Sequence, residues 1–253
     1  VPGLLYSPGD SLVVYIYNEP EKSATVSEDP VSNISGFDLY ENRIIVRHES
    51  ADPLSIADMA IWDSSDDADI PFTAVDGSPD TLTLPSDRKL IVWTGKEFEP
   101  NGNVTISGGG GGAAYDGTLE LFANAVFDAT GSEAHSIGGS LVMGSGAVLD
   151  DETSTFTFTT SGSARTIDTN EYSFYNLILS GSGSWSVTNT ALDVGNDFTI
   201  TQGAVTLPVG TTTVTGSFAV TGGSFIASGG TMLFNSGSGE TIRAGGSNFY
   251  RLT

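Results

Sequence analysis

Apolar and polar residues alternate in short runs along the second half of the chain. Residues 198–200 (Phe-Thr-Ile) precede residues 203–207 (Gly-Ala-Val-Thr-Leu), and in the same way residues 218–220 (Phe-Ala-Val) precede residues 223–227 (Gly-Ser-Phe-Ile-Ala). Alternation with a period of two is typical of a strand with one buried face. The pattern therefore predicts short strands, joined by glycine-containing turns, that repeat about every 20 residues.

This spacing indicates the fold class. Short strands at a period of about 20 residues are typical of a β-solenoid, in which each coil buries its apolar face only against the coils above and below it. We therefore expect an all-β chain whose main part is a parallel β-helix (β-solenoid) with coils of about 20 residues. A large β-sandwich or jelly roll also has short strands and frequent turns, and it is the alternative.

A longer repeat surrounds the short one. Residues 159–167 align with residues 234–242, and residues 173–177 align with residues 248–252, both with the same offset of about 75 residues. Four coils of about 20 residues, one of them shortened, would nearly fill such a unit. The chain stops inside the second copy with no recognisable cap, so we expect a solenoid truncated at its C-terminus.

The first hundred residues differ from the rest in composition. They hold 19 acidic and 6 basic residues and nine of the 10 prolines, whereas most of the glycines follow residue 100. We predict a partial antiparallel β-sandwich-like region over residues 1–41, transitional strands and the start of the solenoid over residues 42–106, and the solenoid with its 75-residue repeat over residues 107–253. The glycine-rich residues 107–113 form a connector near this border.

Three segments of the first region have strand-like patterns, namely residues 11–17, 42–48 and 89–93. Residues 54–62 could form a helical turn or an irregular strand. We expect strand or loop there, because Pro53 and a run of acidic residues flank the segment.

The charge balance excludes several partners. The 253 residues include 31 acidic and 9 basic side chains, for a formal net charge of −22. This surplus argues against nucleic acid and against an anionic membrane surface, because both need clustered Lys and Arg. The chain has no cysteine, and none of its apolar runs approaches the ~20 residues that cross a bilayer. The acidic surplus indicates either simple solubility or the binding of divalent cations.

The densest acidic run suggests a metal site. Asp63, Asp66, Asp67 and Asp69 are spaced so that their oxygen atoms could alternate along a tight turn, as in a Ca²⁺ loop. The run lacks the central glycine and the closing glutamate of an EF-hand loop, and a solvated acidic loop is the alternative. Ca²⁺ is the one cofactor that the sequence suggests.

A second acidic group bears on catalysis. Asp150, Asp151 and Glu152 stand together at an expected corner, and a polysaccharide lyase or glycosidase needs converging carboxylates. Beyond residue 100, however, the chain has three arginines and no lysine, which is little positive charge for a lyase. We therefore expect no enzymatic activity and no catalytic residue.

The remaining candidates are aromatic. Trp62, Trp93 and Trp185 could form a sugar-stacking surface if they were exposed. Trp185 alternates with Val187, which favours a place in the core. His48 and His135 have no partners at the spacing of a metal site, and we expect His48 at the end of a strand.

Parts of the chain resemble a known family. Residues 34–48 (ISGFDLYENRIIVRH), 90–104 (LIVWTGKEFEPNGNV) and 174–177 (FYNL) are similar to segments of very large, repetitive surface proteins of uncultivated bacteria, such as those of the candidate phyla radiation. There, a small sandwich domain leads into a solenoid. The resemblance implies secretion and a β-helical, adhesin-like role at the cell envelope, and it supplies no catalytic residues.

These observations lead to three hypotheses for function. The first is a structural or adhesive segment of a large extracellular cell-surface protein, acting as a rigid spacer or as a stalk that binds surface glycans or a host or neighbouring cell. The second is a carbohydrate-active β-helix. The third is a self-assembling fibre subunit that associates end to end through exposed strand edges. None of them involves membrane insertion of this segment.

Overall fold

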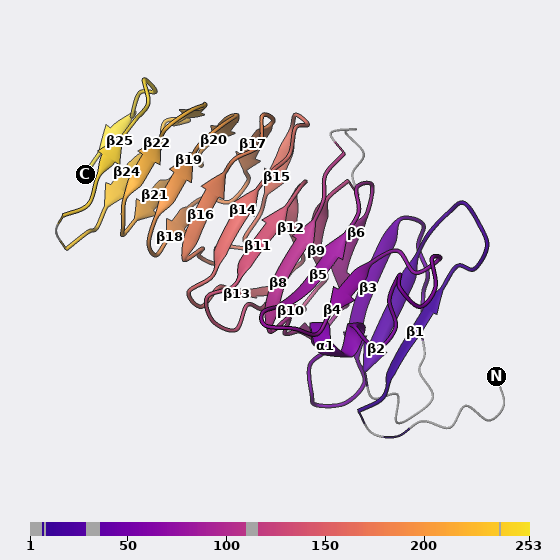
Figure 1. Ribbon diagram of the computed structural model, residues 1–253. Coiled ribbons are helices and arrows are strands. Elements are labelled where there is room, and N and C mark those ends of the chain that lie inside the picture. Colours follow the sequence, from indigo (N-terminus) through magenta and orange to yellow (C-terminus); the bar gives the residue numbers. More distant parts are fainter. Residues whose placement is uncertain (1–6, 8, 29–35, 110–115, 238) are drawn as a thin grey trace.

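The chain forms an elongated stack of strands. The computed structural model describes residues 7, 9–28, 36–109, 116–237 and 239–253, and within them it contains 26 strands and one short helix. Figure 1 shows the strands stacked along one long axis, from β1 near the N-terminus to β25 near the C-terminus. The prediction of an all-β chain is confirmed.

Two long sheets run along this axis. The ten-stranded sheet contains, in spatial order, β1 (Ser11–Tyr15), β2 (Ala24–Glu28), β3 (Arg43–His48), β6 (Lys89–Val92), β9 (Thr118–Leu121), β12 (Leu141–Met143), β15 (Arg165–Ile167), β17 (Ser184–Val187), β20 (Ala204–Thr206) and β23 (Ser224–Ile226). The nine-stranded sheet contains β4 (Thr73–Val75), β5 (Asp80–Leu84), β8 (Gly102–Ile106), β11 (Ala134–Ile137), β14 (Thr155–Phe158), β16 (Asn176–Leu179), β19 (Phe198–Ile200), β22 (Phe218–Val220) and β25 (Ile242–Arg243).

Two shorter sheets complete the coils. The three-stranded sheet contains β7 (Glu97–Phe98), β10 (Val126–Asp128) and β13 (Val148–Asp150). The four-stranded sheet contains β18 (Leu192–Val194), β21 (Thr211–Val214), β24 (Thr231–Phe234) and β26 (Arg251–Leu252). From β6 onward, each complete coil therefore contributes one strand to two or three of the sheets in turn.

Most neighbouring strands run parallel. Among the described strands only the pairs β1–β2 and β4–β5 are antiparallel. The strands β1 and β2 lie at one end of the ten-stranded sheet, and β2 pairs in parallel with β3. The chain is thus a parallel β-solenoid with an antiparallel start, as the sequence predicts.

The coil length varies along the stack. In the C-terminal half, Trp185 pairs with Val205 and Val205 with Phe225, so each coil there has the length that the sequence pattern predicts. In the N-terminal half, Ile45 pairs with Ile91, so the coil between them is more than twice as long. That longer coil contains the helix and the β4–β5 hairpin. The predicted period therefore holds for the C-terminal coils and fails for this N-terminal coil.

The interior is a continuous apolar core. Strand β16 shows the rule, since Leu177 and Leu179 are buried while Asn176 and Ile178 are half-buried on the outer face. Along the nine-stranded sheet the register stacks one inward column of Leu82, Val104, His135, Phe156, Leu177, Phe198 and Phe218. Fully burying one large apolar side chain contributes roughly 1.5–3 kcal/mol, so coil-on-coil packing holds the fold together.

One local prediction is wrong. The segment that was expected to be strand or loop contains α1 (Ile56–Met59). Ser55 caps it, because the Ser55 side chain accepts a hydrogen bond from the Asp58 backbone and the Asp58 side chain accepts one from the Ser55 backbone. This reciprocal capping, together with the burial of Ile56 and Met59, outweighs the nearby proline and acidic residues.

The long sequence repeat does not map onto equivalent places in the coils. Ile167 lies in the ten-stranded sheet, whereas Ile242, its partner in the repeat, lies in the nine-stranded sheet. Leu177 lies in the nine-stranded sheet, whereas Leu252 lies in the four-stranded sheet. The two copies therefore occupy different sides of the stack, and the coil period alone sets which residues pair.

Candidate functional site

The acidic loop between α1 and β4 uses its carboxylates within the protein. Asp63 is buried and accepts hydrogen bonds from the backbone N–H groups of Ser65 (2.7 Å) and Ala74 (2.8 Å). Burial alone would raise the pKa of the Asp63 carboxyl, but these hydrogen bonds outweigh it and lower the pKa. Asp66 accepts a hydrogen bond from the Asp63 backbone at 3.1 Å. These two carboxylates shape the turn.

The other two carboxylates fasten the loop to the β1–β2 hairpin. Asp67 accepts a hydrogen bond from the Tyr15 hydroxyl at 2.8 Å. Asp69 pairs with Lys22 and accepts a hydrogen bond from the Asn18 backbone at 2.6 Å. The hydrogen bond from Lys22 is the main cause that lowers the pKa of Asp69.

The Ca²⁺ prediction therefore gains no support from this loop. Each of Asp63, Asp66, Asp67 and Asp69 has a hydrogen-bond donor of its own. Among the residues that the structure describes, no group of three or more His, Cys, Asp or Glu side chains is arranged to hold a metal ion. A Ca²⁺ site at these four residues remains a prediction.

The second acidic group lies at the end of β13. Asp150 is exposed on the strand, Asp151 is half-buried, and Glu152 is exposed with a positive φ of 44°. Burial raises the pKa of Asp151, although a hydrogen bond from the Ser173 hydroxyl (3.2 Å) opposes the shift. The three residues thus have different surroundings, and the structure does not gather them around one reacting position.

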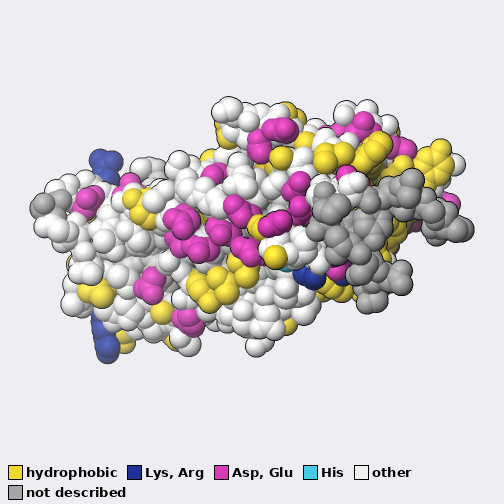
Figure 2. Space-filling view, turned by 90° about the horizontal axis from the view of Figure 1, so that it is seen from below, with side chains coloured by type: hydrophobic (Ala, Val, Ile, Leu, Met, Phe, Trp, Pro, Cys, Tyr) yellow, Lys and Arg dark blue, Asp and Glu magenta, His cyan; other side chains and the backbone are white. Residues whose placement is uncertain are grey.

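Further carboxylates continue this group along the three-stranded sheet. Asp128 pairs with Asp150 in register, and Glu97 pairs with Val126 two residues before Asp128. Burial raises the pKa of Glu97, and the negative charges of Asp128 and Glu99 raise it further. Figure 2, which views the molecule from below, shows Asp and Glu side chains gathered across the middle of that side. A carboxyl with a raised pKa can act as a general acid, which keeps the carbohydrate-active alternative open.

The three tryptophans do not form one surface. Trp62 is 51% exposed near the end of the helical turn, whereas Trp185 is 2% exposed within the core. Trp93 packs against Phe122, with ring centroids 5.2 Å apart. The prediction that Trp185 belongs to the core is confirmed, and the structure shows no shared sugar-stacking platform of all three rings.

A regular, mostly polar surface lies on the outer face of the nine-stranded sheet. It consists of the two outward residues of each of four neighbouring strands, β5, β8, β11 and β14. We call these residues the threonine array: Thr81, Thr83, Asn103, Thr105, Ala134, Ser136, Thr155 and Thr157. All eight are exposed or half-buried, and none is charged.

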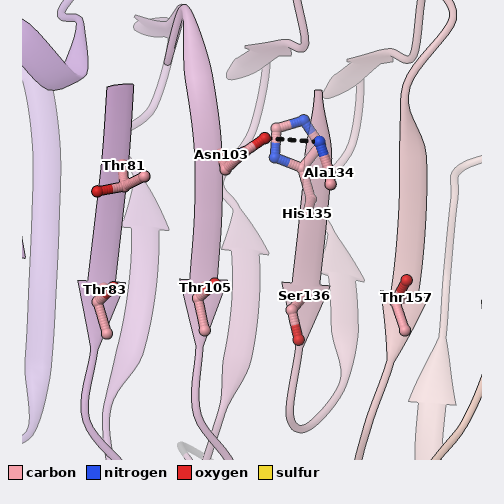
Figure 3. Close-up of a pocket in the computed structure, with 8 residues that line it drawn as sticks. All are labelled: Thr81, Thr83, Asn103, Thr105, Ala134, His135, Ser136 and Thr157. Atoms are coloured by element: carbon pink, nitrogen blue, oxygen red, sulfur yellow. Dashed lines mark hydrogen bonds between the residues drawn. The ribbon is translucent and has the colours of Figure 1, made fainter. Parts of the chain in front are cut away.

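The threonine array surrounds an open hollow. The hollow has a volume of about 480 Å³, and it is lined by seven members of the array and by His135. Figure 3 shows Thr83, Thr105, Ser136 and Thr157 at one level across four neighbouring strands. Asn103 steadies the surface, since its side-chain oxygen accepts a hydrogen bond from the Ala134 backbone at 2.8 Å.

Sequence reasoning did not find this surface. The local signal was present, because Thr81 and Thr83 alternate with Leu82, and Thr155 and Thr157 alternate with Phe156. The pairing of these segments was not visible, because the coil between β8 and β11 is longer than the period seen near the C-terminus. The register between coils is needed to show that the four strands present one continuous polar face.

His135 points to the other side of the same strand. Its ring lies between Phe127 and Phe156, with centroids 5.2 Å and 4.8 Å away, and the residue is 2% exposed. Both ring nitrogens lack a hydrogen-bond partner among the described residues. Burial lowers the pKa of His135 to about 4, so the ring is neutral at pH 7 and belongs to the core.

The chain was also compared with known proteins. In the part of the chain that the structure describes, no helix has the length and apolar character that crossing a membrane requires. Comparison with protein-family models, with curated proteins and with solved structures found no match.

Proposed function

We propose that the chain is a structural or adhesive segment of a large extracellular bacterial surface protein, in which it acts as a rigid spacer or as a surface-binding stalk. The observation that carries the proposal is the unbroken parallel pairing from β2 to β23 in the ten-stranded sheet. Strands about 4.8 Å apart give these nine strands a length of roughly 40 Å without a hinge. The resemblance to repetitive surface proteins supports the same role.

The continuous core supports a mechanical role. Inward residues stack from coil to coil, for example Phe198 on Phe218 with ring centroids 5.3 Å apart. Each coil contacts mainly its neighbours, so the contacts between adjacent coils are what opposes bending of the stack. A high negative charge keeps such a surface soluble in contact with water.

Two measurements on one sample test the proposal. The first is binding to a glycan array with and without Ca²⁺, and the second is the release of reducing or unsaturated sugars from the same glycans. We expect binding without sugar release for an adhesive stalk. A rigid spacer gives neither signal, and small-angle X-ray scattering then shows one extended shape that does not change with protein concentration.

Other outcomes contradict the proposal. Release of sugars would establish a carbohydrate-active β-helix and direct attention to Asp150, Asp151 and Glu152. Particles that lengthen as the protein concentration rises would establish an end-to-end fibre subunit instead. Loss of glycan binding on removal of Ca²⁺ would leave the adhesive role intact and identify Asp63, Asp66, Asp67 and Asp69 as the residues to substitute first.

A further inference from the structure

The threonine array repeats in two directions. Across the strands, Thr83, Thr105, Ser136 and Thr157 follow one another in register, at the strand spacing of about 4.8 Å. Along each strand, outward residues are two positions apart, which is about 6.7 Å. Figure 3 shows one of these rows, Thr83, Thr105, Ser136 and Thr157, in full. The row of Thr83, Thr105, Ser136 and Thr157 is complete in hydroxyl groups, whereas the second row carries hydroxyls only at its two ends, on Thr81 and Thr155.

The hydroxyl groups of one row are free to bind a ligand. Within the described part of the chain, no protein group hydrogen-bonds the hydroxyls of Thr83, Thr105, Ser136 or Thr157, and each residue is exposed or half-buried. The residues between the two rows, such as Leu82 and Val104, are buried in the core and hold the strands in place. A rigid array loses little conformational entropy when it binds, so many weak hydrogen bonds can act together.

The chemistry of the array narrows the class of ligand. No member carries a charge, although the whole chain has a formal net charge of −22, so neither ions nor charged polymers are favoured there. No aromatic ring lies among the eight residues of the array, and the only ring in the lining of the hollow is the imidazole of the buried His135, which leaves sugars without a stacking partner. The threonine methyl groups lie beside the hydroxyl groups. Water molecules next to such apolar groups have restricted orientational freedom, which favours an ordered layer of water on this surface.

The geometry points to a face of ice as the ligand of the threonine array. Oxygen atoms on the faces of hexagonal ice repeat along two perpendicular directions at intervals similar to the strand spacing and to the two-residue rise along a strand. Water molecules held by the complete hydroxyl row and by Thr81 and Thr155 can therefore belong to the crystal lattice and to the protein at once. This activity is independent of the spacer or stalk role, because it requires only the outer face of four strands.

Partition into growing ice tests the inference. The full chain is labelled with a fluorophore, and its concentration is measured in a slowly grown ice shell and in the remaining liquid. We expect the protein to enter the ice, and the variant Thr105→Tyr to remain in the liquid like a protein that does not bind ice. The tyrosine keeps strand propensity but stands above the rows, so the lattice of water cannot reach the neighbouring hydroxyls.

A matched control uses the ten-stranded sheet. Thr206 is half-buried on the outer face of β20, and Thr206→Tyr should enter the ice as the unchanged protein does. Circular dichroism melts confirm that both variants fold, and Thr157→Tyr replaces Thr105→Tyr if the latter unfolds. Exclusion of the unchanged protein from ice, or entry of the Thr105→Tyr variant, would overturn the inference. Retention on ground cellulose or chitin without entry into ice would also overturn it and identify the array as a glycan surface.

Discussion

At the scale of the residue, the buried His135 makes the stability of the protein depend on pH. Burial lowers its pKa from 6.5 to about 4, so the unfolded chain takes up a proton between these values and the folded chain does not. The contribution of His135 to the free energy of unfolding is therefore complete above pH 6.5 and is lost as the pH drops towards 4. The expected loss over this window is about 3 kcal/mol from this group.

Urea unfolding at several pH values measures this contribution. The variant His135→Phe places an apolar ring between Phe127 and Phe156, and it should lack the loss of about 3 kcal/mol that the unchanged protein shows as the pH falls through this window. Equal slopes for the unchanged protein and His135→Phe would contradict the assignment.

Two glycines allow the cost of backbone strain to be measured apart from the cost of a steric clash. Gly223 and Gly229 have φ angles of +82° and +87°, a region that costs a residue with a side chain about 1–2 kcal/mol. A Cβ at Gly223 would lie 2.3 Å from the carbonyl oxygen of Gly203 in the coil below, whereas a Cβ at Gly229 meets nothing within 4 Å. Gly229→Ala should therefore lose about 1–2 kcal/mol and Gly223→Ala clearly more. Urea denaturation compares the two, and equal losses would show that the coils can shift apart.

At the scale of the element, one buried ion pair joins β15 to the chain segment before β9. The Arg165 guanidinium lies 3.0 Å from Asp116, and their side chains are 5% and 0% exposed. Asp116 also accepts a hydrogen bond from the Gly109 backbone at 2.5 Å. Gly109 belongs to the glycine-rich connector, of which residues 110–113 lie outside the described residues. The pair therefore links a strand of one coil to the connector of an earlier coil.

Replacing Arg165 should take its positive charge away from the buried Asp116 carboxylate. We expect Arg165→Met to lower the free energy of unfolding by about 3–5 kcal/mol. Adding Asp116→Asn to this variant removes the second charge but keeps a side-chain oxygen for the backbone donor, so the double variant should be more stable than Arg165→Met alone. Thermal melts measure both, and a double variant that is the less stable of the two would contradict this account.

Some of the elements could be predicted from the sequence, and others could not. Alternation predicted strands such as β19 and β22 correctly, because one buried face determines which residues are apolar. The helix α1 was missed, although Ser55 and Asp58 have the spacing of a capping pair, because the burial of Ile56 and Met59 and the packing of the helix against β4 and β5 are not visible in the sequence. Contacts made by the acidic loop and the rows of the threonine array could not be predicted, because they depend on which coils lie side by side.

At the scale of the whole molecule, the charge should couple stability to ionic strength. A formal net charge of −22 destabilises the compact state through self-repulsion, and salt screens it over about 8 Å at physiological ionic strength. We therefore expect the melting temperature to rise as NaCl is increased from about 0.01 M to about 0.15 M. The double variant Asp128→Asn and Asp150→Asn, which removes two carboxylates in register, should show a smaller rise. A melting temperature that falls with NaCl would mean that attractive ion pairs dominate instead.

The unequal coils have a consequence for how such a protein can change during evolution. Ile45 and Ile91 pair in parallel although a helix and a hairpin lie between them in the sequence, while coils near the C-terminus return to the ladder after less than half that length of chain. An insertion at a corner therefore leaves the pairing of the strands on either side unchanged. New loops, hairpins or helices can be added to one coil while the rest of the stack is inherited intact, and the same corners are the places at which a designer can graft a binding segment.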